Sequence, residues 1–366
     1  MSTSLLRRRS VAAIVATLAC ITAACGSGET TEEKNELTPL SMVTYGTAAF
    51  SWMTEFAAAN GVFERNGLDV TLEPVKSSTI ASAALTSGSV DISLASPMSQ
   101  LPAIVKGADV QMISGETGNP FAFTVNPDSA SDAPWPEWVK NYDDKKIGVT
   151  AIGSGGYFFT KLMFKEAGLS DEKVEYVACG SGPECNVALE TGRIDAVMSS
   201  YPYVGELVAK DKGVVLLDMI HQLDVTMGYP ADLVEVAGAT YIGSFAKRSW
   251  IEKNPGTVEK YQLAMMEASC IVNNTDNRQA FADFVRELGA VPASVSDDEL
   301  VDFVYSSLRY SAAAPVKDAD AWGKFVVELG GLENAPAASE WTHPDIAQSD
   351  TEVIERVEAA GGSCSI

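Results

Sequence analysis

"ALTSGSVDISLAS" (residues 84–96) and "ALETGRIDAVMSS" (residues 188–200) are two copies of one joint, and they decide how we expect this chain to fold. They share Ala, Leu, Gly, Asp and the final Ser at a constant offset of 188 − 84 = 104 residues. Each copy is typical of a helix end, a glycine and a short strand entered through an aspartate, Asp91 or Asp195. The repeat predicts two similar α/β lobes. A chance likeness is the alternative, because Gly-x-[Val/Ile]-Asp is a common joint in such sheets.

Strand and helix patterns alternate around these joints. The first half predicts strands over 41–45, 68–73, 91–94 and 110–114, with helices over 51–60 and 98–105. This spacing is typical of βαβ units, and therefore of mainly parallel sheets with helices on both faces. Further helices are predicted over 257–273, 277–288, 297–307 and 319–329. We expect lobe 1 over 37–122, lobe 2 over 123–236, and a return to lobe 1 plus C-terminal helices over 237–366.

Residues 1–24 have the features of a secretion signal. Arg7, Arg8 and Arg9 precede a short apolar run, which at about twelve residues falls short of the ~20 needed to span a bilayer. The stretch "TAACG" (22–26) resembles a bacterial lipoprotein box, which predicts lipid attachment at Cys25. Residues 25–36 predict a flexible tether. We expect an exported protein anchored to the outer face of the cell membrane. An ordinary cleaved signal without lipid is the alternative, and export by either the Sec or the twin-arginine route stays open.

The chain is strongly acidic, with 26 Lys and Arg against 49 Asp and Glu. Removal of residues 1–24 would take away three basic residues and no acidic ones, leaving a formal charge of 23 − 49 = −26. Such a body repels phosphate backbones and anionic headgroups, so we exclude nucleic acid as a partner and expect the lipid to be the only membrane contact. The two histidines, His221 and His343, are too few to favour histidine catalysis or a His-rich metal site. We expect no metal, no cofactor and a monomer.

Four cysteines follow Cys25 in the expected exported body: Cys179, Cys185, Cys270 and Cys364. An even number in an exported protein predicts disulfides. Three pairings are conceivable, and loop closure favours Cys179 with Cys185, across a turn-rich stretch, and Cys270 with Cys364. The spacing C-x5-C is wider than that of common zinc sites.

Four longer stretches follow one another in a specific order: "GVFERNGLDVTLEPV" (61–75), "ALTSGSVDISLASP" with "VKGADVQMISG" (84–115), "KKIGVTAIGSGGYFFTKLMFKEAGL" (145–169) and "SWIEKNPGTVEKYQLAMMEA" (249–268). Together they resemble the solute-binding proteins of bacterial ABC importers of the nitrate, sulfonate/taurine and thiamine-precursor type. The resemblance implies a type II periplasmic-binding fold with a hinge, a solute held between the lobes, and a membrane permease with its ATPase as partners. The stretch "SDAPWPEW" (131–138), with Trp135 and Trp138, and the tail after Leu332 depart from the family.

Candidate ligand-binding residues follow from the parallel sheets, since ligands lie beyond the carboxyl ends of the strands, where helices begin. The predicted contacts of the first lobe are Gly46, Thr47, Phe50, Ser78, Thr79, Ser96 and Pro97. Those of the second lobe are Gly153, Ser154, Gly155, Gly156, Tyr157, Ser181, Ser200 and Tyr201. Hydroxyls and backbone N–H groups suit a sulfonate, nitrate or carboxylate, and the aromatic rings suit a flat or apolar part of the solute. These loops contain no Arg, and Lys76 is the nearest cation.

Structural roles are the alternative for several of these residues. Ser154 and Thr79 could be helix N-caps, and Asp91 and Asp195 are expected to be strand-entry residues rather than catalytic carboxylates. A dinucleotide enzyme is disfavoured because Phe158 stands at the third glycine position of G-x-G-x-x-G, and the chain has no G-x-S-x-G elbow. We therefore expect a binding protein and not an enzyme. A ligand-binding sensor domain, or an enzyme of the thiamine-pyrimidine type with the same fold, remains the alternative.

Overall fold

The computed structural model describes residues 36–180, 183–220, 223–291, 296, 301, 304, 309–329 and 332–366. The predicted signal, Cys25 and Ser181 lie outside these residues, as do His221, all of the tether except Glu36 and most of the predicted helix over 297–307. Residues 36–366 belong to one compact unit.

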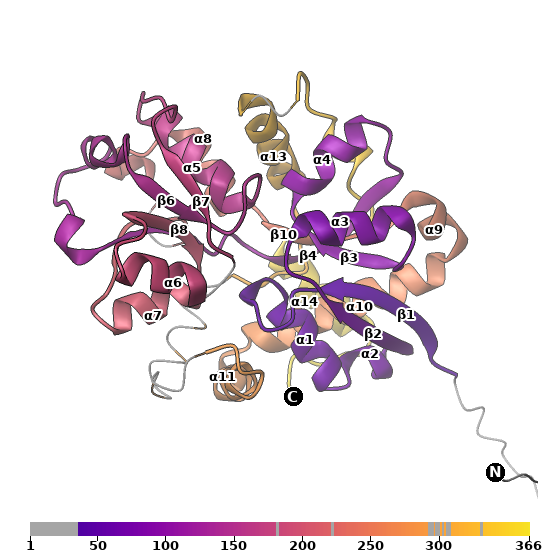
Figure 1. Ribbon diagram of the computed structural model, residues 1–366. Coiled ribbons are helices and arrows are strands. Elements are labelled where there is room, and N and C mark those ends of the chain that lie inside the picture. The colour runs from indigo at the N-terminus through magenta and orange to yellow at the C-terminus, as the bar shows by residue number, and fades with distance from the viewer. Residues whose placement is uncertain are drawn as a thin grey trace, which may run out of the picture. The chain divides into compact units, whose positions relative to one another are not determined.

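Two five-stranded sheets organise this unit (Figure 1). The first sheet has the order β2-β1-β3-β10-β4 and consists of β1 (Thr38–Thr44), β2 (Leu68–Pro74), β3 (Ile92–Ala95), β4 (Val110–Thr117) and β10 (Ile242–Lys247). The second has the order β7-β6-β8-β5-β9 and consists of β5 (Phe121–Val125), β6 (Lys146–Val149), β7 (Glu175–Ala178), β8 (Ala196–Ser200) and β9 (Val214–Asp218).

Each sheet is mainly parallel, as predicted, but contains one reversed strand. In the first sheet β10 runs antiparallel to its neighbours β3 and β4, and in the second β5 runs antiparallel to β8 and β9. The other four strands of each sheet share one direction. The carboxyl ends of these four strands therefore lie at the same edge as the amino end of the reversed strand.

The sequence repeat corresponds to equivalent places in the two sheets. β3 and β8 end the two copies, and each pairs in parallel with the first parallel strand of its sheet, β1 or β6. The aspartate of each copy binds that neighbouring strand. Asp91 Oδ2 accepts hydrogen bonds from the Ser41 N–H and hydroxyl at 3.0 and 2.8 Å, and Asp195 Oδ2 accepts one from the Lys146 N–H at 2.8 Å. The predicted strand-entry role is confirmed.

Helices cover both faces of both sheets. They are α1 (Trp52–Ala59), α2 (Val62–Arg65), α3 (Ser78–Ser87), α4 (Pro97–Val105), α5 (Gly155–Glu166), α6 (Pro183–Glu190), α7 (Tyr203–Ala209), α8 (Ala231–Gly238), α9 (Arg248–Lys253), α10 (Pro255–Asn273), α11 (Arg278–Glu287), α13 (Val316–Glu328) and α14 (Asp350–Ala359). Alternation along β1 separates the two faces, because successive side chains of a strand point to opposite sides. Leu40 and Met42 join the main core with Trp52 of α1, whereas Val43 joins a separate cluster with Ala81 of α3.

Two crossing segments connect the sheets. β4 ends at Thr117 and β5 begins at Phe121, while β9 ends at Asp218 and β10 begins at Ile242. The Tyr241 N–H donates to the Thr117 carbonyl at 2.8 Å, so the two crossings are hydrogen-bonded to one another. This pair of crossings lies where the predicted hinge between the lobes would be.

Helix α13, which comes late in the chain, contacts α4 beside the first sheet and α8 beside the second, and it fixes one of these crossings. Asp318 accepts hydrogen bonds from the Thr240 N–H and hydroxyl, both at 2.9 Å. The Trp322 indole N–H donates to the Thr240 carbonyl at 2.8 Å. These groups are buried. The backbone immediately before β10 is therefore held in place by a helix that comes late in the chain.

Both predicted disulfides are present. The Cα atoms of Cys179 and Cys185 are 5.0 Å apart, and those of Cys270 and Cys364 are 4.9 Å apart. The second disulfide ties the C-terminal tail to α10, where the side-chain amides of Asn274 and Asn277 also donate to the Cys364 carbonyl.

The two tryptophans of the stretch that departs from the family pattern have aromatic neighbours. Trp138 is buried and contacts Phe123 of β5, with ring centroids 5.7 Å apart. Trp135 is half-buried against Trp138 and Tyr229. Both rings therefore help to pack the second sheet.

Candidate functional site

A small cavity of about 100 Å³ lies between the two sheets, at the edge where the carboxyl ends of their parallel strands meet. Its lining from the first sheet and the adjoining helices is Tyr45, Ala48, Phe50, Val75, Lys76, Ser77, Ser78, Thr79, Ser96, Met98, Ser99, Tyr241 and Ile242. Its lining from the second is Phe121, Thr150, Ala151, Ile152, Gly153, Ser154 and Gly155. Pockets for drug-sized ligands are typically about 300–1,000 Å³, so this cavity suits a smaller molecule.

Several of the hydroxyls around the cavity belong to helix starts. Ser77 is the N-cap of α3, and its Oγ accepts a hydrogen bond from the Ile80 N–H at 3.4 Å. Ser154 is the N-cap of α5, and its Oγ accepts from the N–H groups of Ala151 and Tyr157 at 3.3 and 3.4 Å. The N-cap prediction is therefore confirmed for Ser154. For Thr79 it is wrong, because α3 begins two residues earlier than this assignment requires and Ser77 occupies the cap.

A partly buried chain of hydrogen bonds runs from the cavity wall into the first sheet. The oxygen atoms of Tyr45 Oη and Ser78 Oγ are 2.7 Å apart, and Tyr45 Oη lies 3.0 Å from the Leu94 carbonyl oxygen. Tyr45 follows β1 directly, Leu94 belongs to β3 and Ser78 begins α3. Burial raises the pKa of Tyr45, so its phenol keeps its hydrogen at neutral pH.

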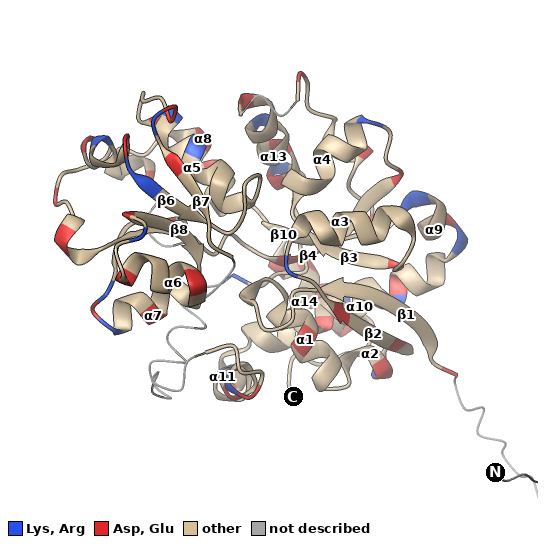
Figure 2. Ribbon diagram, viewed as in Figure 1, with Lys and Arg blue, Asp and Glu red and all other residues tan. Residues whose placement is uncertain are grey.

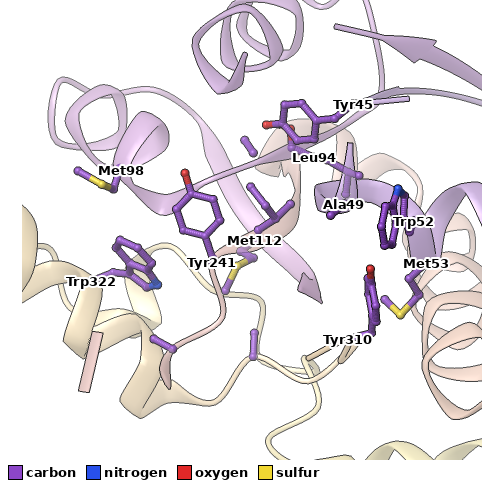
Figure 3. Close-up of a cluster of buried hydrophobic side chains, with 14 of the residues drawn as sticks. Tyr45, Ala49, Trp52, Met53, Leu94, Met98, Met112, Tyr241, Tyr310 and Trp322 are labelled. Atoms are coloured by element: carbon purple, nitrogen blue, oxygen red, sulfur yellow. The ribbon is translucent and has the colours of Figure 1, made fainter. Parts of the chain in front are cut away.

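Aromatic rings form the wall next to this chain. Tyr241 lies edge-on to Phe121, with centroids 5.3 Å apart, and is tilted against Phe50 and Trp322 at 5.7 and 5.8 Å. Figure 3 shows the hydroxyls of Tyr45 and Tyr241 directed toward the same region, beside Met98. Offset and edge-on aromatic contacts stabilise such a wall and offer a surface on which the apolar part of a solute can lie.

Gly155 allows the second sheet's helix α5 to approach Tyr241. A Cβ atom at position 155 would lie 2.0 Å from the Tyr241 hydroxyl oxygen and 2.9 Å from Cζ. Contacts below 3.0 Å essentially do not occur for real Cβ atoms. Glycine is therefore required at this position by the close approach of the tyrosine across the interface.

Lys76 is the one charged side chain in the cavity lining among the described residues, and it is exposed. Figure 2 shows most other charges spread over outer elements, for example α6, α9 and α13. With no carboxylate in the described lining, the cavity is surrounded by hydroxyls, helix N-termini and one ammonium group. Such groups favour an anionic or strongly hydrogen-bond-accepting group on the solute.

The structure brings together about half of the predicted contacts. Phe50, Ser78, Thr79, Ser96, Gly153, Ser154 and Gly155 line the cavity. Gly46, Thr47, Pro97, Gly156, Tyr157, Ser200 and Tyr201 do not line it, and Ser181 lies outside the described residues. As contacts of a bound solute, all of these residues stay predictions.

The predicted residues outside the cavity have structural contacts of their own. A Cβ at Gly156 would lie 2.8 Å from the Met198 carbonyl oxygen, so Gly156 packs α5 onto β8. The Tyr157 ring lies edge-on to Tyr176 at 4.7 Å, and Tyr201 Oη donates to Asp218 Oδ2 at 3.2 Å.

Sequence reasoning missed three aromatic residues of the lining: Tyr45, Phe121 and Tyr241. Phe121 begins β5 and Tyr241 directly precedes β10, the two reversed strands, so their amino ends reach the edge where the parallel strands end. A rule that considers only the carboxyl ends of strands overlooks them. The available signal is their position at the two crossings between the sheets, "TGNPF" (117–121) and "GATYI" (238–242).

Within the part of the chain that the structure describes, no group of three or more His, Cys, Asp or Glu side chains is arranged to hold a metal ion. No helix formed by the described residues is long and apolar enough to cross a membrane.

The fold is that of periplasmic solute-binding proteins. The periplasmic nitrate-binding protein NrtA from Synechocystis PCC 6803 superposes with a TM-score of 0.66 and 14% sequence identity, covering 88% of this chain and 89% of NrtA. The alkanesulfonate-binding protein SsuA from Xanthomonas axonopodis pv. citri bound to MOPS superposes with a TM-score of 0.64 and 16% sequence identity, covering 84% of this chain and 99% of that one. The periplasmic aliphatic sulphonate binding protein SsuA from Escherichia coli superposes with a TM-score of 0.63 and 14% sequence identity, covering 83% of this chain and 91% of that one.

A search of curated protein sequences found no match. The model of the NMT1-like family matches residues 38–286, which are 249 of the 366 residues. The chain therefore belongs to the NMT1-like family. The predicted two-lobe α/β fold and the predicted resemblance to solute-binding proteins of nitrate and sulfonate importers are confirmed.

Proposed function

We propose that this protein is the solute-binding component of an ABC importer, which captures a small molecule between its two sheets and delivers it to a membrane permease and its ATPase. The observation that carries the proposal is the cavity itself. Both sheets contribute hydroxyls or helix N-termini to one small cavity beside the two crossings. A solute that binds both sides at once favours the closed arrangement of the lobes, and a permease can recognise that arrangement.

The solute that fits is small and carries an anionic or accepting group with a short apolar part. Lys76, the Ser77 and Ser154 hydroxyls and the amino ends of α3 and α5 supply positive potential and donors. The rings of Phe50 and Tyr241 supply the apolar wall. Sulfonates and small carboxylates meet this description, whereas nitrate has the anionic group but no apolar part. The described lining has no Asp, Glu, His or Cys, which supports binding without chemical conversion.

A ligand screen tests the proposal. The full-length protein is heated with sulfonates, nitrate, pyrimidines and aromatic carboxylates, and a bound solute raises the melting temperature. The solute is then recovered from the protein and analysed by mass spectrometry. Recovery of the unchanged compound supports a binding protein, whereas chemical conversion of the tightest ligand would contradict the proposal. Loss of uptake of the same compound when the gene is deleted separates transport from sensing.

We further propose export and lipid attachment at Cys25, on the sequence pattern of residues 1–26. A single acyl chain binds membranes only weakly, but a diacylglycerol anchor with two chains holds a protein stably. Metabolic labelling with a radioactive fatty acid should mark the wild-type protein and leave Cys25→Ala unlabelled. Equal labelling of both would contradict the assignment. Residues 26–36 would then link the anchor to the folded unit. Within that unit, we propose that the lobes meet at the boundaries 122/123 and 236/237.

A further inference from the structure

The hydrogen bonds around Tyr45 determine which way the Ser78 hydroxyl points. Tyr45 Oη lies 3.0 Å from the Leu94 carbonyl oxygen, and the contact is buried. A carbonyl oxygen can only accept, so the single phenol hydrogen must lie between these two atoms. If it pointed elsewhere, two buried oxygen atoms would face each other through their lone pairs, which is unfavourable.

Ser78 must therefore be the donor in its contact with Tyr45. Their oxygen atoms are 2.7 Å apart, which is the normal length of an O–H···O hydrogen bond. Because the phenol hydrogen is committed to Leu94, the hydrogen between Ser78 and Tyr45 belongs to the serine. Ser78 also lines the cavity. What its oxygen has left to offer a solute is a lone pair.

The neighbouring hydroxyls of Ser77 and Ser154 have the opposite hydrogen-bonding role: they accept from the protein and can donate to a solute. Ser77 Oγ accepts from the Ile80 N–H, and Ser154 Oγ accepts from the Ala151 and Tyr157 N–H groups. Their own hydrogens have no acceptor among the hydrogen bonds of the described residues, so both remain available as donors. The cavity thus combines donors at Ser77, Ser154 and Lys76 with an acceptor at Ser78.

We propose that Ser78, oriented by Tyr45, selects solutes that carry an N–H or O–H group in addition to their anionic group. The inference rests on the proposed function and narrows its substrate class. Nitrate and unsubstituted alkanesulfonates have no N–H or O–H group that could donate a hydrogen bond, so their binding would leave the Ser78 oxygen desolvated and without a donor. Amino- or hydroxy-substituted acids pair with it. A site built to bond a polar group rejects an analogue that lacks this group more strongly than an apolar pocket rejects a missing methylene.

Pairs of ligands of nearly equal shape measure this selection. In each pair an amino group replaces a methyl group: taurine with propane-1-sulfonate, β-alanine with butyrate, and 4-aminobenzoate with 4-methylbenzoate. The amino group is a charged ammonium in the first two pairs and neutral in the third, so the third pair compares hydrogen bonding without a change of charge. Dissociation constants are determined by titration calorimetry on the full-length protein. In whichever pair binds, we expect the amino compound to bind about tenfold more tightly or better, which corresponds to one hydrogen bond.

Two variants connect the selection to the hydrogen-bond chain. Tyr45→Phe removes the acceptor of the Ser78 hydrogen, which then becomes free to donate, so the preference for the amino compound should fall at least about threefold and the methyl compound should not lose affinity. Ser78→Ala should bring the two members of a pair to within about threefold. Ser87→Ala is the matched control, because Ser87 is exposed on the same helix and its hydroxyl bonds only the carbonyl of Ala84 and the Ser89 hydroxyl.

Equal or tighter binding of the methyl compound by the wild-type protein would overturn the inference, as would an unchanged preference in Tyr45→Phe. Neutron diffraction on the deuterated protein tests it without any solute. We expect one deuterium on Tyr45 Oη toward the Leu94 carbonyl and one on Ser78 Oγ toward Tyr45. A tyrosine deuterium pointing at Ser78 would overturn the assignment. If no panel compound binds, the proposed anion classes fail, and the neutron result alone decides the polarity of Ser78.

Discussion

Replacement of Gly155 by alanine tests whether the contact between α5 and Tyr241 sets the geometry of the cavity. The added Cβ would lie 2.0 Å from the Tyr241 hydroxyl oxygen, whereas ordinary van der Waals contact begins at 3.4 Å. The hydroxyl or the start of α5 must therefore move by 3.4 − 2.0 = 1.4 Å. Tyr241 has little room to retreat, because it is buried among Phe121, Phe159 and Trp322.

The expected cost follows from two opposing effects. Overpacking a well-filled site destabilises proteins by about 1–3 kcal/mol. Alanine is a better helix residue than glycine by up to about 1 kcal/mol, and less at the first position of a helix. Gly155→Ala should therefore lower the free energy of unfolding by about 1–2 kcal/mol. The displacement also moves the Ser154 cap, so solute affinity should fall about tenfold.

Urea unfolding with a matched glycine isolates the clash. Gly256 also lies in the first turn of a helix, α10, and a Cβ there would meet nothing within 4 Å. Gly256→Ala should leave stability unchanged or raise it by about 0.4–1 kcal/mol. In a Tyr241→Phe background the hydroxyl is gone and the nearest ring atom is 2.9 Å from the new Cβ, so the cost of Gly155→Ala should fall by at least half. If Gly155→Ala proves as benign as Gly256→Ala, the contact does not hold α5 in place.

Three further predictions test other parts of the structure. The double variant Cys270→Ala with Cys364→Ala should lower the free energy of unfolding by about 2–4 kcal/mol, because this disulfide spans 94 residues. Cys179→Ala with Cys185→Ala should lower it by less, because that disulfide spans only 6 residues. Equal urea midpoints for the two double variants would contradict this. Ser154→Ala should cost about 1 kcal/mol through loss of the α5 cap and weaken solute binding in calorimetry, and an unchanged affinity would remove Ser154 from the site. Burial raises the pKa of Glu116 from 4.5 to about 8. The native state therefore holds a proton that the unfolded state releases, and the free energy of unfolding should fall as the pH rises from about 4.5 to 8. Glu116→Gln should flatten this part of the unfolding profile, and an unchanged slope would place the ionisation elsewhere.

Much of the fold could be predicted because its signals are local. The Gly-x-[Val/Ile]-Asp joints, the alternation of strands and helices and the apolar face of 257–273 each depend on residues a few positions apart. β3 and β8 consequently occupy the places that the repeat predicts, and Asp91 and Asp195 bind the neighbouring strands as strand-entry residues do. Loop closure favoured, among three conceivable pairings, the one that the structure contains.

The candidate site was predictable only in part. The rule that ligands lie beyond the ends of parallel strands found Ser78, Ser96 and Ser154 of the cavity lining, but it also selected Ser200 and Tyr201, which do not line it. Phe121 and Tyr241 were missed because the direction of a strand in its sheet depends on the path of the chain between the sheets, and no local pattern records it. The tail after Leu332 likewise gave no sign that Trp341 would be fully buried and stacked on Phe245 of β10.

By itself, then, the sequence determined the class of fold, a preferred pairing of the cysteines and a set of hydroxyl-bearing loops, since each depends on periodicity, spacing or residue type. Only the tertiary structure decided which of these loops meet around one cavity and what each hydroxyl can do there. Ser78 lies 33 residues from Tyr45, and Tyr45 lies 49 residues from Leu94. Ser78 can act as an acceptor toward a solute only because Ser78 donates to Tyr45 and Tyr45 donates to Leu94. These hydrogen bonds form only once the sheet and α3 have brought the three residues together.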